Sequence, residues 1–253
     1  MPAISVIIPT CNRAAMLDKA IDALVRTTAT PFEVIVVDGA SSDSTPAVLA
    51  KWKEALGQRM VVVQETKREG FTRAVNKGFR AASSEYVTWL NDDARPLAGA
   101  LDFAREQLAE APLSVGLLAM FHRCETRMNI AYTAIRHGRE FKLLHVRGTL
   151  YANFAFARRS TLEKLNYFDE GFFIHGADPD LSLKIWHSGL RVVPAFQSLI
   201  DHDEAADERR AMDAGQGARD NARLFTKWKL PPKNMAVNDF DPAHPCTMRG
   251  LQS

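Results

Sequence analysis

The chain has 253 residues, of which 46% are hydrophobic and 25% charged, as in an ordinary globular protein. Its formal net charge of +2 gives no reason to expect nucleic acid as a partner, and we predict none. It has no run of about 18 apolar residues, so no transmembrane segment is predicted, and its start lacks the basic region of a secretory leader. The three widely spaced cysteines, Cys11, Cys124 and Cys246, suit a reducing cytosol.

The first hundred residues alternate between strand patterns and helical patterns. Continuous apolar runs over residues 4–9, 33–38, 60–64 and 86–90 predict strands that are buried on both faces. Between them, apolar side chains recur at helical spacing within residues 17–24, 48–56 and 71–82. This alternation predicts an α/β fold with a Rossmann-like, mostly parallel central sheet and helices on both of its faces.

The second half of the chain is less regular. It predicts helices over residues 97–109, 159–165 and 180–187, with Asp180 as the N-cap of the last one, and strands over residues 115–120, 151–157 and 190–195. The Arg- and His-rich stretch 121–152 has no clear pattern. It is interpreted as a loop over the ligand site, a contact for a phosphorylated or lipid-linked acceptor, or a solvated insertion. Residues 207–229 predict a charged helix that either docks on anionic lipid or packs on the protein surface.

Polar segments follow three of the predicted strands, at the sheet edge where open parallel sheets bind ligands. These segments cover residues 9–13, 38–45 and 91–93. Residues 9–14 contain no glycine, so the turn of a dinucleotide-binding enzyme is absent, and the chain has no G-x-x-x-x-G-K-[ST] phosphate loop. A nucleotide at this edge would therefore be held by side chains and a metal ion.

Carboxylates stand out in two of these segments. Asp38 ends an apolar strand, where it either accepts a hydrogen bond from a nucleobase or ribose or caps the following turn. Asp92 and Asp93 are adjacent and repel each other unless a cation or hydrogen-bond donors compensate. Oxygen ligands of this kind favour Mg²⁺ or Mn²⁺, and an ordinary polar turn is the alternative interpretation.

Two later residues carry further chemistry. Asp178 follows a segment rich in aromatic residues, where apolar rings could raise its pKa and suit it to act as a base. With an ordinary pKa, an aspartate is already ionised at neutral pH and needs only to be placed correctly. His202 follows the last predicted core strand and is either a metal ligand or an ordinary histidine.

Five segments, in this order, resemble the family 2-type glycosyltransferases with the GT-A fold. They are residues 5–13 (SVIIPTCNR), 34–45 (VIVVDGASSDST), 70–78 (GFTRAVNKG), 90–96 (LNDDARP) and 168–181 (FDEGFFIHGADPDL). The D-x-D metal motif of the family reads Asn91-Asp92-Asp93 in this chain. With the segment 70–78, this is most similar to the rhamnosyl- and galactofuranosyl-transferase branch.

The resemblance implies an inverting, metal-dependent hexosyl- or deoxyhexosyl-transferase of glycan or polysaccharide biosynthesis. The donor is a UDP-, dTDP- or GDP-sugar, and the acceptor is a hydroxyl group of a glycan, glycolipid or small molecule. Asp178 is implied as the catalytic base, and Asp93 and His202 as ligands of Mn²⁺ or Mg²⁺. The implied substrate-binding residues are Pro9, Thr10, Asn12, Arg13, Asp38, Arg73, Asn76, Asn91, Asp92 and Asp180.

The same resemblance suggests how the chain is divided. We expect one glycosyltransferase domain over residues 1–230, with a nucleotide-sugar-binding half (1–98), an acceptor half (99–204) and a C-terminal helix (205–230), followed by a tail (231–253). The protein is expected in the cytoplasm or at the inner face of the membrane. Two rival functions are a non-catalytic nucleotide-sugar-binding protein, suggested by the family departures at Asn91 and Ala177, and a nucleotidyltransferase, disfavoured by the missing glycine-rich loop.

Overall fold

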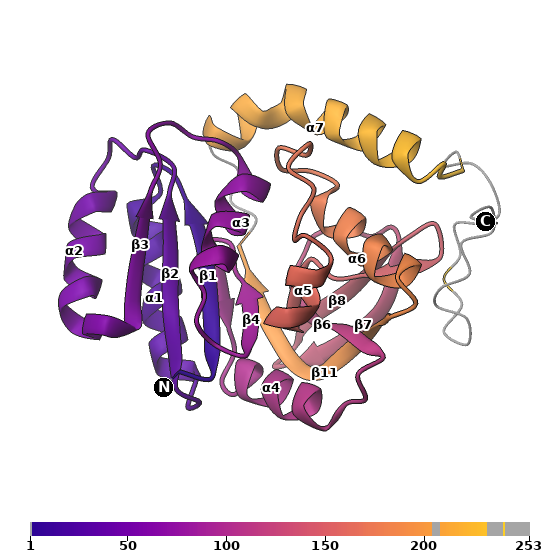
Figure 1. Cartoon of the computed structure of the whole chain (residues 1–253), viewed down its shortest axis with the longest axis horizontal. Coiled ribbons are helices and arrows are strands. Elements are labelled where there is room, and N and C mark those ends of the chain that lie inside the picture. The colour runs from indigo at the N-terminus through magenta and orange to yellow at the C-terminus, as the bar shows by residue number, and fades with distance from the viewer. Residues whose placement is uncertain (1, 204–207, 232–239, 241–253) are drawn as a thin grey trace.

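An 11-stranded sheet runs through the computed structural model, which describes residues 2–203, 208–231 and 240 (Figure 1). Its first four strands pair in parallel in the order β3-β2-β1-β4. They are β1 (Ile4–Thr10), β2 (Phe32–Asp38), β3 (Met60–Gln64) and β4 (Tyr86–Trp89). The four apolar runs therefore form strands where they were predicted.

Helices cover both faces of this sheet, as predicted. One face packs against α1 (Ala14–Thr27), α2 (Thr45–Leu56) and α4 (Ala100–Glu110). A short 3₁₀ turn (Gly57–Arg59) follows α2. The other packs against α3 (Phe71–Ala81), α5 (Arg159–Lys164) and α6 (Ala177–His187). Successive side chains of β1 enter opposite cores, Val6 and Ile8 on the α1 side and Ile7 on the α3 side, because side chains alternate along a strand.

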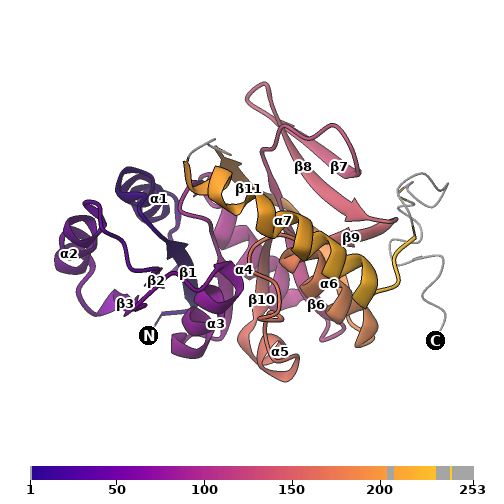
Figure 2. The same ribbon diagram turned by 90° about the horizontal axis from the view of Figure 1, so that it is seen from above.

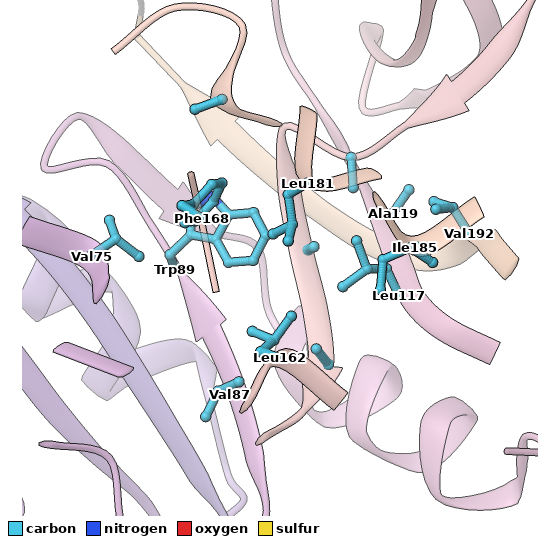
Figure 3. Packing of buried hydrophobic residues seen from close by; sticks show 14 of the residues in the cluster. Val75, Val87, Trp89, Leu117, Ala119, Leu162, Phe168, Leu181, Ile185 and Val192 are labelled. Atoms are coloured by element: carbon cyan, nitrogen blue, oxygen red, sulfur yellow. The ribbon is translucent and has the colours of Figure 1, made fainter. Parts of the chain in front are cut away.

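Aromatic packing fixes α6 against the sheet. Phe168 meets Trp89 of β4 edge-on with ring centroids 5.1 Å apart, and Leu181 of α6 lies beside them in the same core (Figure 3). All three side chains are almost completely buried. The start of α6 is therefore packed against the sheet close to the end of β4.

The second half of the sheet mixes strand directions. From β4 the order continues through β10 (Phe154–Arg158), β6 (Val115–His122), β11 (Arg191–His202) and β5 (Ala94–Pro96). β10 is antiparallel to both of its neighbours, whereas β6 and β11 pair in parallel. The strand predicted over residues 151–157 is divided in the structure, since β9 (Thr149–Tyr151) ends before β10 begins.

Residues 121–152 contain a β-hairpin that the sequence did not predict. β7 (Ile130–Arg136) and β8 (Arg139–Val146) pair antiparallel, and β8 also contacts β6 and β9. The hairpin projects from the body of the molecule (Figure 2). Most of β7 is only partly buried, so its sequence lacks the clean alternation of a half-buried strand.

The C-terminal helix α7 (Glu208–Lys227) crosses the molecule from above α3 to α6 (Figures 1 and 2). Asp213 pairs with Arg68 near one end, and Lys227 pairs with Asp180 of α6 near the other. The predicted charged helix is thus confirmed as one that packs on the body. The predicted tail lies outside the described residues, apart from residues 231 and 240. Within the described part of the chain, no helix has the length and apolar character needed to cross a membrane.

Two helical glycines give a matched test of this packing. A Cβ at Gly78 of α3 would collide with the Ile7 side chain of β1, whereas one at Gly215 of α7 would meet nothing within 4 Å. We expect Gly78→Ala to lower the free energy of unfolding by about 1–3 kcal/mol through overpacking. Gly215→Ala should raise it by up to about 1 kcal/mol through helix propensity. Urea unfolding measures both, and equal effects would contradict the close approach of α3 to β1.

Candidate active site

A cavity of about 340 Å³ opens at the carboxyl ends of β1, β2 and β4. The structure brings many of the predicted site residues to it, although they come from distant parts of the chain. Those that line the cavity are Pro9, Thr10, Asn91, Asp92, Asp93, Asp178 and His202. The cavity therefore lies at the sheet edge where open parallel sheets bind ligands.

Arg13 holds the two adjacent carboxylates of this edge. Its Nη1 lies 2.7 Å from Asp92 Oδ1 and 3.0 Å from Asp93 Oδ2, and all three side chains are buried. The Thr10 hydroxyl donates a further hydrogen bond of 2.9 Å to Asp92 Oδ2. One guanidinium thus serves two carboxylates, so Arg13 and the aspartate pair together retain one negative charge.

Asp93 also faces His202, at the end of β11. The distance from Asp93 Oδ1 to His202 Nε2 is 3.2 Å, and the Asn91 amide lies 3.5 Å from the same nitrogen. Burial alone would raise the pKa of Asp93, but the His202 ring and the Arg13 guanidinium bring it well below its ordinary value. Asp93 is therefore an ionised carboxylate across the physiological pH range.

The donor set at this point fits a divalent cation. A carboxylate oxygen and an imidazole nitrogen face each other, and both are ligand types that Mn²⁺ accepts. Among the described residues, no three His, Cys, Asp or Glu side chains converge as a complete metal cage. Two protein ligands with an excess negative charge match a metal that shares its remaining positions with substrate phosphates.

Asp178 sits in the first turn of α6, which begins at Ala177 with Gly176 as its N-cap. The Asn153 side-chain amide lies 3.5 Å from Asp178 Oδ2, and Oδ1 is buried with no hydrogen-bond partner among the described residues. Burial raises the pKa of Asp178 to about 8, although Asn153 and Trp89 oppose the shift. The expectation of an ordinary aspartate, ionised at neutral pH, is therefore wrong, whereas the raised pKa expected beside apolar rings is found.

Two predicted residues shape the loop after β2 without lining the cavity. The fully buried Asp38 carboxylate accepts hydrogen bonds from the Ser41 hydroxyl (2.5 Å) and from the Gln64 amide (2.8 Å). Asn12 accepts one from the backbone N–H of Ser42 (2.7 Å). The neighbouring Gly39 lines the cavity, so Asp38 lies at the border of the cavity. The Asp38 carboxylate also accepts a hydrogen bond from the backbone N–H of Ser41 and so caps the turn after β2, which is one of the two roles that the sequence left open.

Three other predicted residues lie away from the cavity. The buried Asn76 amide holds the backbone of Phe168 in both directions, at 3.0 Å each, and Arg73 is exposed beside a neighbouring groove. Asp180 is completely buried and accepts a hydrogen bond of 2.7 Å from the Trp228 indole. Because α6 begins at Ala177, Asp180 lies inside the helix, and its prediction as N-cap is wrong.

Several residues that follow β3 also line the cavity and were not predicted from the sequence. Glu65 and Arg68 line the cavity, and Arg68 forms a two-pronged ion pair of 2.9 and 2.6 Å with Asp213 of α7. These residues could have been predicted, because β3 is parallel to β2 and the carboxyl ends of both strands therefore lie at the same edge of the sheet. The position of Asp213 at the cavity could not have been predicted in this way, since it depends on the path of α7 across the molecule.

Asp178 also borders a second cavity of about 410 Å³, on the side of α7 and the β8–β9 turn. Asn153 and His175 line this cavity as well, together with Tyr151 of β9 and Phe225 of α7. One carboxylate therefore faces two neighbouring spaces. Such an arrangement allows a single group to act on two different molecules.

The chain resembles known proteins over most of its length. The model of the family described as "Glycosyl transferase family 2" matches residues 5–165. A GalNAc(5)-diNAcBac-PP-undecaprenol beta-1,3-glucosyltransferase of Campylobacter jejuni is 34% identical over 110 residues, which are 44% of this chain and 36% of that protein. A validoxylamine A glucosyltransferase of Streptomyces hygroscopicus subsp. limoneus is 39% identical over 101 residues, 39% of this chain and 22% of that protein. The aligned part thus spans about a third or less of the length of these relatives.

Solved structures confirm the predicted fold. The mannosyltransferase PcManGT from Pyrobaculum calidifontis, in complex with GDP-Man and Mn²⁺, has a TM-score of 0.64 at 25% identity, covering 93% of this chain and 66% of that one. S. aureus TarS 1-349 in complex with UDP-GlcNAc has a TM-score of 0.65 at 20% identity, covering 83% and 61%. The latter shows a likeness of fold alone. On the match over residues 5–165, this chain belongs to glycosyl transferase family 2.

Proposed function

We propose that the protein is an inverting glycosyltransferase that moves a hexosyl or deoxyhexosyl group from a nucleoside-diphosphate sugar to an acceptor hydroxyl. One observation carries the proposal: Asp178 lines the same cavity as the facing pair Asp93 and His202. Family membership and the names of the relatives support it. The narrower likeness to rhamnosyl- and galactofuranosyl-transferases stays a prediction, as does the identity of the donor base.

The reaction is a direct displacement at the anomeric carbon. The acceptor oxygen attacks from the face opposite the diphosphate and forms the new glycosidic bond. The bond from the anomeric carbon to the diphosphate oxygen breaks, and the nucleoside diphosphate leaves with the electron pair. Asp178, in its ionised form, takes the proton of the acceptor hydroxyl, and its raised pKa makes that form a stronger base than an ordinary aspartate.

The donor lies along the ends of the first strands in this proposal. Thr10 and the Asp38-Gly39 corner would border the nucleoside, and Asp93 and His202 would hold Mn²⁺ or Mg²⁺. When bound, the ion would supply positive charge that stabilises the diphosphate leaving group. The role of Arg13 is to hold Asp93 in place, so that one carboxylate oxygen faces His202.

The acceptor occupies the second cavity, on the other side of Asp178. Its lining combines the amides of Asn129, Asn153 and Asn221 with the rings of Tyr151 and Phe225. Amides hydrogen-bond hydroxyl groups and aromatic rings cover the apolar faces of sugars, so a glycan or a glycolipid headgroup suits this space. The protein then acts in glycan or polysaccharide biosynthesis.

A ligand screen tests the proposal. The purified protein is heated with UDP-, dTDP- and GDP-sugars in the presence of Mn²⁺, and the sugars that raise its Tm are assayed for release of the nucleoside diphosphate. A ligand at a hundredfold excess over its Kd should stabilise the native state by about 2.7 kcal/mol. If no nucleotide sugar raises the Tm, the proposal is wrong. A sugar that binds without transfer or hydrolysis would instead identify a non-catalytic binding protein.

The two histidines of the cavity give a matched test of the metal site. His202→Ala should weaken Mn²⁺ binding at least about tenfold, because it removes one of two protein ligands. His175→Ala should leave Mn²⁺ binding unchanged, since His175 lines the same cavity but the imidazole that lies 3.2 Å from Asp93 Oδ1 is that of His202. Titration of Mn²⁺ followed by electron paramagnetic resonance, with UDP present, measures both. Equal affinities of the two variants would exclude His202 as a ligand.

A further inference from the structure

The segment before α6 determines where Asp178 lies. Ile174 and His175 of this segment line the 340 Å³ cavity, and Asp178 follows in the first turn of the helix. Gly176, between them, has a φ of 69° and forms the N-cap. A shift of residues 173–175 would therefore move the start of α6 and the carboxylate on it.

One side of this segment is fastened to α3. The carbonyl oxygen of Phe172 accepts a hydrogen bond of 2.5 Å from the Thr72 hydroxyl, and that of Phe173 accepts one of 2.7 Å from the backbone N–H of Phe71. Both donors belong to the first turn of α3. The carbonyl groups are thus satisfied by the nucleotide-binding half of the fold.

The other side is fastened to α7 by a single carboxylate. Asp220, 4% exposed, accepts hydrogen bonds from three consecutive backbone N–H groups: those of Phe173 (3.1 Å), Ile174 (2.8 Å) and His175 (2.9 Å). Backbone N–H groups in folded proteins are nearly always paired, and here one carboxylate pairs with three that are partly buried. Asp220 is thus the acceptor that fixes this stretch of backbone.

The inner face of α7 is built for this contact. Asp213, Gly217, Asp220 and Leu224 recur at spacings of four, three and four residues, which places them on one face of the helix. A Cβ at Gly217 would lie 2.8 Å from the His175 ring, so the absence of a side chain there lets α7 approach the segment closely.

We infer that Asp220 is a positioning residue for the transfer reaction: it holds residues 173–175 so that Asp178 faces the donor cavity. This inference rests on the proposed function. Asp220 acts through the backbone and touches neither donor nor acceptor.

Two variants of Asp220 and one neighbour test the inference. Asp220→Ala removes the acceptor, Asp220→Asn keeps one acceptor oxygen, and Arg219→Ala changes the adjacent, exposed residue of α7. We expect Asp220→Ala to speed amide hydrogen exchange at residues 173–175 and to lower kcat about ten- to a hundredfold, with donor KM changed less than about threefold. Asp220→Asn should recover most of the kcat, and Arg219→Ala should behave as the wild type.

Several results would contradict the role inferred for Asp220. A wild-type kcat for Asp220→Ala, or unchanged exchange at residues 173–175, would overturn the inference. An equal loss of kcat in Arg219→Ala would do the same, because it would reflect α7 in general. If Asp220→Ala does not fold, Asp220→Ser takes its place in the comparison. If the wild type transfers no sugar, the proposed function fails, whereas the exchange data still decide whether Asp220 holds the segment.

Discussion

Asp178→Asn is expected to lower kcat for sugar transfer by about 10³-fold while nucleotide-sugar binding stays within about twofold of the wild type. An amide matches the shape of the carboxylate but cannot take the acceptor proton. Binding should persist because the groups proposed to hold the donor, among them Asp93 and His202, are untouched. Product formation followed by mass spectrometry gives kcat, and calorimetry gives the donor Kd. A variant that transfers sugar at the wild-type rate would show that another group is the base.

The same substitution should stabilise the protein. The pKa of Asp178 is about 8 in the folded state against an ordinary 3.8, so the folded state binds a proton that the unfolded state has lost between those values. The contribution of Asp178 to stability is therefore fully present below pH 4 and is lost as the pH rises through 8. We expect Asp178→Asn to exceed the wild type in free energy of unfolding by on the order of 5 kcal/mol at pH 8, and by little at pH 4. Thermal unfolding across this range measures the difference.

Arg13→Met is expected to destabilise the protein by about 3–5 kcal/mol. The guanidinium is buried against Asp92 and Asp93, so its loss leaves two adjacent carboxylates in a buried site without this cation. Arg26→Met is the matched control, because Arg26 pairs with Asp22 on the surface, with 69% and 48% of the two side chains exposed. Exposed pairs contribute at most about 1 kcal/mol.

Equilibrium unfolding of the two arginine variants in guanidinium chloride measures the loss of stability in each. If Arg13→Met and Arg26→Met lose the same small amount of stability, Arg13 does not neutralise the aspartate pair. Mn²⁺ should recover part of the loss in Arg13→Met, since a divalent cation offsets the same negative charge.

Much of the fold follows from local sequence patterns, and the misses have physical causes. β1, β2 and β4 are buried on both faces, so their apolar runs identify them directly. The apolar run of β3 also predicts a strand, but β3 lies at the edge of the sheet and is only partly buried, so the expectation of burial on both faces is wrong there. β7 was not predicted because it is only partly buried, and β5 was not predicted because a strand of three residues is too short to show a pattern. The antiparallel direction of β10 depends on its pairing with β4 and β6, which a local pattern does not contain.

Two of the candidate site residues could be predicted from their place in the sequence. Asp93 was singled out because adjacent carboxylates after a strand need an explanation, and Asp178 because it follows a segment rich in aromatic residues. The pairing of Arg13 with Asp92 and Asp93 joins residues about eighty positions apart, and the sequence had suggested a substrate contact for Arg13 instead. Asp220 was missed because its role depends on where α7 crosses the molecule.

Anomalous diffraction from crystals grown with Mn²⁺ and the best-binding nucleoside diphosphate tests the shared cavity most directly. We expect an anomalous peak between Asp93 Oδ1 and His202 Nε2, with the diphosphate beside it and the nucleoside toward Thr10 and Gly39. Asp178 should lie beyond the terminal phosphate, on the far side of the space that the donor sugar would occupy. Manganese bound elsewhere, or a nucleotide outside this cavity, would contradict the account.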